Sequence, residues 1–294
     1  MGCNARLAKS FEYALVLPLE PKSKYILFSD CHRGSGKAND NFLKDEFIYL
    51  AALKYYERRC FTYLELGDGD ELWENRSIEK IKETHPHSFE MLSRLYYKNR
   101  LYIIYGNHDM VKKNASFQKN YCESFYSGQL FCHYPACFGI RFYPSIILKD
   151  AFGKKDIYLT HGHQASLMNS TFWKINRFLV RHIWKYLELI GIPDPTSAAK
   201  NNTRKEKTEK TLLKWAKNHS VILITGHTHR PMAGTKESPF FNTGSCIHPA
   251  GITGIEIENR CITLVKWSLG TRHDQEVYVK REALAETVCV DEYV

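Results

Sequence analysis

Five short polar clusters, each at the end of an apolar run or shortly after one, constrain the fold of this chain more than any other feature. Taken singly, each cluster has an ordinary explanation as a turn or a strand exit. Together they place oxygen and imidazole ligands at five successive points, which indicates one shared site. The clusters are Asp30-Cys31-His32, Gly67-Asp68-Gly69-Asp70-Glu71, Gly106-Asn107-His108-Asp109, His161-Gly162-His163 and Gly226-His227-Thr228-His229.

The segments around the first three clusters predict the fold class. Apolar runs at residues 25–28, 61–66 and 101–105 are typical of buried strands, and residues 46–60 and 78–98 carry apolar side chains at helical spacing. This alternation predicts an α/β fold with sequential strands side by side. Ligands of such sheets gather beyond the carboxyl ends of the strands, which is where the clusters lie.

The second half of the chain favours strands. After a helix expected at residues 115–126, strands are predicted at 140–148, 157–159, 221–224, 254–258, 262–267 and 277–279. We expect them to form a second, more antiparallel set that closes a sandwich. Because no repeat, low-complexity tract or linker interrupts the chain, residues 1–294 are expected to form a single domain.

The composition limits the class of protein. The hydrophobic fraction of 44% and charged fraction of 25% are ordinary for a soluble globular chain. No apolar run approaches the roughly 20 residues that span a bilayer, and the N-terminus lacks the apolar region of a secretion signal. Nine scattered cysteines without a Cys-x-x-Cys pair predict reduced thiols. We therefore expect a cytoplasmic protein, either free or peripheral at the membrane.

Most of the net charge of +9 lies in an insert at residues 164–219. The insert has eleven Lys and Arg residues and four Asp and Glu residues. Helices are expected at 171–190 and 205–218, and Lys174, Arg177, Arg181 and Lys185 share one face of the first. Either this helix packs on the sandwich with a solvated basic stripe, or it is a cap over the site. In the second case its basic face, with Arg177 and Arg181, contacts phosphate and its apolar face contacts an apolar substrate or a membrane surface.

The mixture of ligands in the clusters indicates the metal and the chemistry. Carboxylates and imidazoles suit Mn²⁺, Fe or Zn²⁺, whereas a site of oxygens alone favours Mg²⁺ or Ca²⁺. A carboxylate such as Asp68 can bridge two ions about 3.5 to 4 Å apart. Two such ions bind a phosphoryl group and lower the pKa of a bound water, so that hydroxide can attack phosphorus near neutral pH. An imidazole can then protonate the leaving oxygen.

The order Asp-x-His, Gly-Asp-x-x-Glu, Gly-Asn-His-Asp, His-Gly-His and Gly-His-Thr-His resembles the calcineurin-like metallophosphoesterases. The resemblance implies a four-layer α/β/β/α sandwich of two mixed sheets. It also implies that His108 is the catalytic histidine and that Glu71 pairs with it, which predicts a hydrogen bond between them. One metal would be held by Asp30, His32, Asp68 and His229, and the second by Asp68, Asn107, His161 and His227.

Within that family, three features are similar to the UDP-2,3-diacylglucosamine pyrophosphatase branch, whose insert covers acyl chains. They are Gly-Asp-x-x-Glu-Leu-Trp, Gly-His-Thr-His-Arg-Pro and the helical insert between the last two histidine motifs. The chain departs from that branch in having His108 in place of Arg and His163 in place of Asp. The departures concern the substrate and leave the metal ligands intact.

Two residues beside the ligands are further candidates. Arg33 follows His32 and either clamps a phosphate bidentately or faces solvent. His163 either supports a ligand or contacts the substrate. Asp70 has no predicted role.

These observations predict a dinuclear metal-dependent phosphohydrolase acting on a phosphodiester, pyrophosphate or phosphomonoester, with a small, nucleotide or lipid-linked diphosphate favoured. Mn²⁺ is the expected metal. A nuclease of the same family is the alternative enzyme, in which the basic insert would hold a nucleic-acid backbone. A non-catalytic scaffold with a decayed site is the third interpretation, against which the complete ligand set argues.

Overall fold

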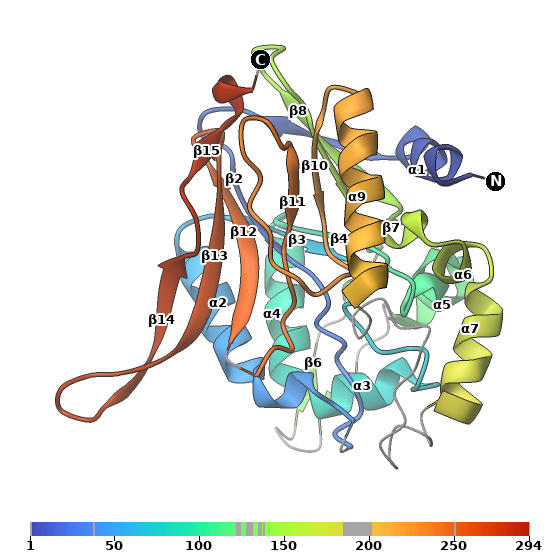
Figure 1. Ribbon diagram of the computed structural model, residues 1–294. Coiled ribbons are helices and arrows are strands. Elements are labelled where there is room, and N and C mark those ends of the chain that lie inside the picture. The colour runs from blue at the N-terminus through green and yellow to red at the C-terminus, as the bar shows by residue number, and fades with distance from the viewer. Residues whose placement is uncertain are drawn as a thin grey trace.

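The computed structural model describes residues 2–37, 39–121, 125–127, 132–134, 137, 139–184, 202–249 and 251–293. Figure 1 shows two sheets with helices on their outer sides. The longer helices are α1 (Cys3–Glu12), α2 (Glu46–Arg58), α3 (Ile78–Thr84), α4 (Pro86–Tyr97), α5 (Ala115–Tyr121), α6 (Leu167–Ser170), α7 (Trp173–Leu179) and α9 (Asn202–Asn218). Short helical turns are η1 (Phe42–Lys44), η2 (Met110–Lys113), η3 (His163–Ala165), η4 (Val180–Trp184) and η5 (Val290–Glu292).

The larger sheet has the strand order β14-β13-β12-β2-β3-β4-β7, and β15 pairs with β13 beside this path. The central strands β2, β3, β4 and β7 run parallel, and β12 pairs antiparallel with β2. The bounds are β2 (Lys24–Phe28), β3 (Thr62–Leu66), β4 (Leu101–Ile104), β7 (Phe142–Tyr143), β12 (Ile252–Glu258), β13 (Cys261–Thr271), β14 (Val277–Ala283) and β15 (Val288–Cys289).

The second sheet has the order β1-β8-β9-β10-β11, in which only β8 and β9 pair antiparallel. Its strands are β1 (Leu15–Leu19), β8 (Ser145–Asp150), β9 (Ile157–Thr160), β10 (Ile222–Thr225) and β11 (Phe240–Asn242). The expectation that all later strands form the second sheet is wrong, because β12, β13 and β14 extend the first. The alternation of apolar and polar residues predicts a strand but not the strand with which it pairs. Here Ile255 of β12 pairs with Leu27 of β2, which places β12 in the larger sheet.

The two sheets pack face to face through an apolar layer that includes Leu27, Leu64 and Ile224. Helices α2 and α4 cover the outer face of the larger sheet, and α1 and α9 cover that of the second (Figure 1). The buried area is mostly Ile, Leu and aromatic side chains, which supply the main driving force for folding. The predicted four-layer α/β/β/α sandwich is confirmed.

Several helix predictions need correction. The helix predicted at 78–98 is divided into α3 and α4 at His85, because Pro86 has no N–H to continue the first helix. The helix predicted at 115–126 ends at Tyr121, and residues 125–127 form β5 (Phe125–Ser127), which pairs with β6 (Cys132–Tyr134). In the insert, α7 continues into the π-helical turn η4.

The second half of the insert joins the sandwich. Helix α9 buries Leu212 and Trp215 against Leu7 of α1 and Phe240 of β11, so it belongs to the outer helical layer. Residues 185–201 of the predicted insert, with Lys185 and Lys200, lie outside the described residues. Among the described residues, the insert meets the polar clusters through residues 164–184 and through Glu209 of α9, which accepts from Thr228 over 2.9 Å.

The expectation of reduced cysteines is wrong for one pair. Cys261 and Cys289 form a disulfide, because the antiparallel register of β13 and β15 sets them opposite each other. Cys31, between two ligand positions, is a buried free thiol. Within the described ranges, no helix combines the length and apolarity that crossing a membrane requires.

Candidate metal centre

The predicted ligands follow the carboxyl ends of five strands. Strands β2, β3 and β4 are neighbours in one sheet, and β9 and β10 are neighbours in the facing sheet. The polypeptide leaves all five strands at the same edge of the sandwich, so segments that are far apart in sequence meet there. The residues concerned are Asp30 and His32 after β2, Asp68 after β3, Asn107 and His108 after β4, His161 after β9, and His227 and His229 after β10.

Five of these ligand positions have left-handed backbone conformations, which side chains other than glycine rarely adopt. The φ angles range from 47° at His32 to 70° at His227. Each such residue costs free energy and persists only where its surroundings hold it in place. The concentration of these angles at Asp30, His32, Asp68, His227 and His229 marks a shaped site rather than relaxed loops.

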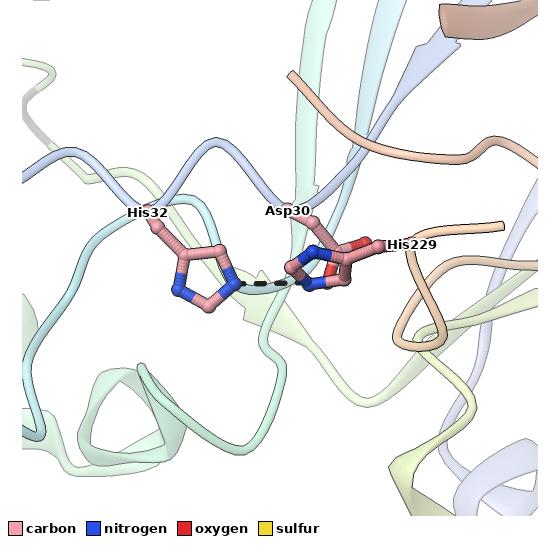
Figure 2. A group of neighbouring side chains, drawn as sticks. All are labelled: Asp30, His32 and His229. Atoms are coloured by element: carbon pink, nitrogen blue, oxygen red, sulfur yellow. Dashed lines mark ion pairs between the residues drawn. The ribbon is translucent and has the colours of Figure 1, made fainter. Parts of the chain in front are cut away.

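Three side chains form the first ligand group. One ligand atom from each of Asp30, His32 and His229 lies within 4.8 Å of the others. Nε2 of His229 is 3.0 Å from Oδ1 of Asp30, and Nε2 of His32 is 3.8 Å from the same oxygen. Figure 2 shows the imidazoles of His32 and His229 next to the Asp30 carboxylate. The three converge on one position suited to a cation.

Asp68, His161 and His227 form a second group with the same 4.8 Å limit. Nε2 of His161 is 3.0 Å from Oδ2 of Asp68. The same oxygen lies 3.9 Å from Nε2 of His32 in the first group. Asp68 therefore stands between the two groups, where a bridging carboxylate is expected.

The fit to metal ions can be judged from buried polar atoms. Four predicted ligand atoms are buried without a hydrogen bond among the described residues, namely Asp30 Oδ1, His32 Nε2, Asn107 Oδ1 and His161 Nε2. Buried polar atoms are normally satisfied, so an unsatisfied set that converges needs an explanation. Carboxylate and amide oxygens with imidazole nitrogens are a suitable donor set for divalent transition metals. The residues therefore fit the metals that the sequence predicts.

The imidazoles are oriented by partners outside the ligand groups. Glu71 accepts at His32 Nδ1 over 2.8 Å and at His108 Nδ1 over 2.9 Å, and the Leu66 carbonyl lies 2.8 Å from His161 Nδ1. These contacts leave Nε2 of each ring directed away from its partner, as is usual for metal-binding histidines. The predicted Glu71–His108 hydrogen bond is confirmed. The contact of Glu71 with His32 was not predicted.

His108 lies at the opening of the site. Its ring stacks on Trp73 with centroids 4.1 Å apart and planes 23° apart, and its backbone N–H donates to Asp68 over 2.8 Å. Burial lowers the pKa of His108, but the Glu71 and Asp68 carboxylates outweigh burial and raise that pKa above its ordinary value. These two carboxylates therefore favour the protonated form of the imidazole.

The carboxylates stay charged despite burial. Burial raises the pKa of Asp68, but the charges of His161 and His108 bring it well below its usual range. In return, Asp68 and Asp30 overcome the burial of His161 and raise its pKa to about 9. Burial and the charge of His161 lower the pKa of His227 to about 3. The site thus stabilises positive charge between its carboxylates.

The structure rejects Arg33 as a phosphate clamp. Its side chain is fully buried, with Nη1 and Nη2 each 2.9 Å from Glu65 and Nε 2.8 Å from Asp70. Lys112 is also fully buried, and its Nζ lies 2.8 Å from Asp70 and 2.6 Å from Asp109. These five residues form a buried charge network, which also explains Asp70. A hint existed in the sequence, because Glu65 interrupts the apolar run of β3.

The charge network supports the ligand segments. Asp109 accepts from the backbone N–H of Gly106 over 2.6 Å and from that of Gly69 over 3.1 Å. Arg33 N–H donates to the Gly69 carbonyl over 3.0 Å, and Glu71 N–H donates to the Arg33 carbonyl over 2.9 Å. The network therefore joins the segments after β2, β3 and β4 beneath the metal ligands.

The insert contacts the site in ways that the sequence did not reveal. Nδ2 of Asn169 in α6 lies 3.3 Å from His227 Nε2, and Oδ1 of Asn169 accepts a hydrogen bond from Asn176 Nδ2 over 2.9 Å. Arg181 was predicted to contact substrate, but its Nε donates to the Trp73 carbonyl over 2.7 Å and its Nη2 to the Leu72 carbonyl over 2.9 Å. It holds the segment that carries Trp73.

The remaining candidates keep their open roles. The Arg177 guanidinium lies 4.9 Å from the centre of the Trp173 ring. His163 is only 3% exposed, its ring centre is 5.5 Å from that of His161, and its Nδ1 has no hydrogen bond among the described residues. His163 is thus placed beside the second ligand group without serving it as a hydrogen-bond partner.

Comparison with known proteins agrees with the site. The family model described as calcineurin-like phosphoesterase matches residues 23–231, which include all five polar clusters. No curated protein matches the chain. Among solved structures, Vps29 from Chaetomium thermophilum matches with 12% identity and a TM-score of 0.42, over 92% of this chain and 98% of that one. The family model matches well over half of the length of this chain, so the chain belongs to the calcineurin-like phosphoesterase family.

Proposed function

We propose that this protein is a dinuclear metal-dependent phosphohydrolase. In this proposal Asp68 would be a ligand of both ions. The observation that carries it is the meeting of two ligand groups at Asp68, with four buried ligand atoms lacking hydrogen bonds. Asp30, His32, Asp68 and His229 would hold one ion, and Asp68, Asn107, His161 and His227 the other.

When bound, the two ions would polarise the phosphoryl group and lower the pKa of a water that attacks it, with Mn²⁺ the first candidate and Fe or Zn²⁺ the others. The chain provides the other half of the reaction. As the water oxygen bonds to phosphorus, the bond to the leaving oxygen breaks, and His108 gives its proton to that oxygen. Glu71, 2.9 Å from His108 Nδ1, accepts a hydrogen bond from Nδ1–H and so stabilises the imidazolium, whose Nε2–H is the proton that is given.

A diphosphate, either small or lipid-linked, is the substrate class we favour. The likeness to the UDP-2,3-diacylglucosamine pyrophosphatase branch supports it, and so does the insert, where large apolar side chains face solvent near basic residues. Such a surface suits an acyl chain or a membrane carrying the substrate, with Arg177 as the phosphate contact. The exposed apolar residues are Leu167, Met168, Phe172, Ile175, Phe178 and Ile183.

Nuclease activity is the second candidate. It is favoured by Lys207, Lys210 and Lys214, which line an open groove along α9 where a nucleic-acid backbone could bind. Steeply salt-dependent DNA binding, lost when these lysines are changed to Gln, would support it. Liposome binding that is lost on charge reversal of Arg177 would support the lipid-linked substrate instead.

The central test is hydrolysis by the Mn²⁺-loaded protein. We expect cleavage of bis-(p-nitrophenyl) phosphate or p-nitrophenyl phosphate, and metal analysis should find two ions per chain. Asp68→Ala should lose activity and metal, whereas Asp274→Ala, an exposed carboxylate in the β13–β14 turn, should behave like the parent. If the parent cleaves neither ester and Asp68→Ala binds metal equally well, a non-catalytic scaffold becomes the better interpretation.

A further inference from the structure

A pocket of about 530 Å³ opens beside the metal centre. One wall is α1, with Arg6 and Lys9, and the facing walls come from the end of β4, from η2 and from η3. Helix α1 lies outside the residues that the family model matches.

The pocket adjoins the second ligand group. Tyr105 lines it and directly precedes Gly106-Asn107, and Lys113 lines it from η2, which follows His108 and Asp109. His163 lines it from η3, with its ring centre 5.5 Å from that of His161. A group bound in the pocket would thus be close to a phosphoryl group held at Asn107 and His161.

The charged side chains that line the pocket are all positive. Arg6, Lys9 and Lys113 line it, and no Asp or Glu does. Among the described residues, neither Lys9 nor Lys113 forms an ion pair. Burial and the neighbouring charge of Lys174 lower the pKa of Lys113, so an anion placed beside it would be favourable. Arg6 is fixed against η3 by donating to the Gln164 carbonyl over 2.8 Å.

The pocket also holds an unsatisfied buried group. His163 is 3% exposed, and its Nδ1 has no hydrogen bond among the described residues. A buried polar atom without a partner is costly unless a ligand or water completes it. Phe142 and Tyr105 add aromatic, largely apolar surface to the lining of the pocket. The arrangement suits an anionic group attached to a less polar moiety.

We infer that this pocket binds a second phosphoryl group of the substrate, beside the one that is hydrolysed. The inference rests on the proposed function and deepens it, because it assigns a binding place to the second phosphoryl group of the diphosphate favoured as substrate. Lys113 and Lys9 would contact the second phosphoryl group, and His163 would complete its hydrogen bonding. The metal ligands play no part in that contact.

The test measures binding without metal, so that it is independent of catalysis. Inorganic pyrophosphate and inorganic phosphate are titrated calorimetrically into the chelator-treated protein. We expect pyrophosphate to bind more tightly than phosphate, and Lys113→Gln to weaken pyrophosphate about tenfold, as for the loss of one charge-assisted contact. The matched control is Lys119→Gln on α5, an exposed lysine that does not line the pocket and should leave the affinity unchanged.

Two outcomes would overturn the inference. One is that the metal-free protein does not bind pyrophosphate, and the other is that Lys113→Gln binds it as well as the parent does. Hydrolysis of p-nitrophenyl phosphate by the Mn²⁺-loaded parent is the separate arm that tests the proposed function. If hydrolysis is present but pyrophosphate affinity is unaffected by Lys113→Gln, only the pocket is refuted. If hydrolysis is absent, the proposed function fails whatever the titration shows.

Discussion

The buried charge network beneath the metal centre makes a sharp prediction for Asp70. Its carboxylate is fully buried, 2.8 Å from Arg33 Nε and 2.8 Å from Lys112 Nζ. Asp70→Asn keeps the shape of the side chain but removes the negative charge between two buried cations. Glu65 and Asp109 still balance the charges of the two cations, but each cation loses its contact with the Asp70 carboxylate, so we expect the free energy of unfolding to fall.

The size of the effect follows from burial. Breaking a buried ion pair by removing one partner costs about 3 to 5 kcal/mol. Glu65 and Asp109 still contact the two cations, and the amide oxygen of Asn can accept one hydrogen bond, so the lower end of this range applies, about 3 kcal/mol. That is a large part of the roughly 5 to 15 kcal/mol that stabilises a typical domain.

Urea unfolding followed by tryptophan fluorescence measures the change. With a slope of about 3 kcal/mol/M, the midpoint should fall by roughly 1 M. The control is Asp274→Asn, the same substitution at an exposed carboxylate, which should stay within about 0.5 kcal/mol of the parent. If Asp70→Asn is as stable as this control, the contacts of Asp70 contribute nothing net and the reasoning is wrong.

Three further predictions concern the groups around the site and the core. Glu71→Gln should reduce metal affinity about 10-fold to 100-fold in a metal titration, because it weakens the hold on His32 and His108; unchanged affinity would contradict this role. Arg181→Met should lower the free energy of unfolding by about 1.5 to 3 kcal/mol, because it leaves the Leu72 and Trp73 carbonyls without a charged donor, whereas Arg177→Met should have a smaller effect. His85 lies 3.0 Å from Asp40 and 3.0 Å from Glu46, which outweigh its burial and raise its pKa from 6.5 to about 8. Since the folded-state pKa is the higher one, about 2 kcal/mol of stability is present below pH 6.5 and lost as the pH rises through 8, so His85→Gln should destabilise the protein more at pH 6 than at pH 9 in urea unfolding, with His87→Gln as the exposed control.

The ligand positions could be predicted because their signal is local. Each cluster lies within a few residues of an apolar run, and parallel strands bring such ends to one edge. The resemblance to the family, together with the spacing of Asp68 and Glu71, predicted the contact of Glu71 with His108, and that contact is present.

Strand partners and long-range pairs were not predictable in this way. The alternation in residues 254–258 indicates a strand, but only the backbone pairing of Ile255 with Leu27 assigns it to the larger sheet. The disulfide between Cys261 and Cys289 depends in the same way on the register of two antiparallel strands. Counting cysteines carries no information about that register.

Arg33 shows why a residue next to a ligand can be misjudged. Its position after His32 suggested an exposed phosphate contact, yet a parallel bridge to Asp70 carries it beneath the site. The fork of its guanidinium is then filled by Glu65, a charged residue within an otherwise apolar strand. A carboxylate in a buried strand needs a buried cation, so the signal was in Glu65 rather than in Arg33.

The charge network supports the segments that carry the left-handed ligand positions. A residue other than glycine in this conformation costs of the order of 1 kcal/mol or more, and five ligands adopt it. Bound metal could compensate this cost only while it is bound. Arg33, Asp70 and Asp109 instead tie the segments after β2, β3 and β4 together through the protein itself. We therefore expect the metal-free chain to keep the ligands close to their binding positions, so that metal binding requires little reorganisation of the backbone.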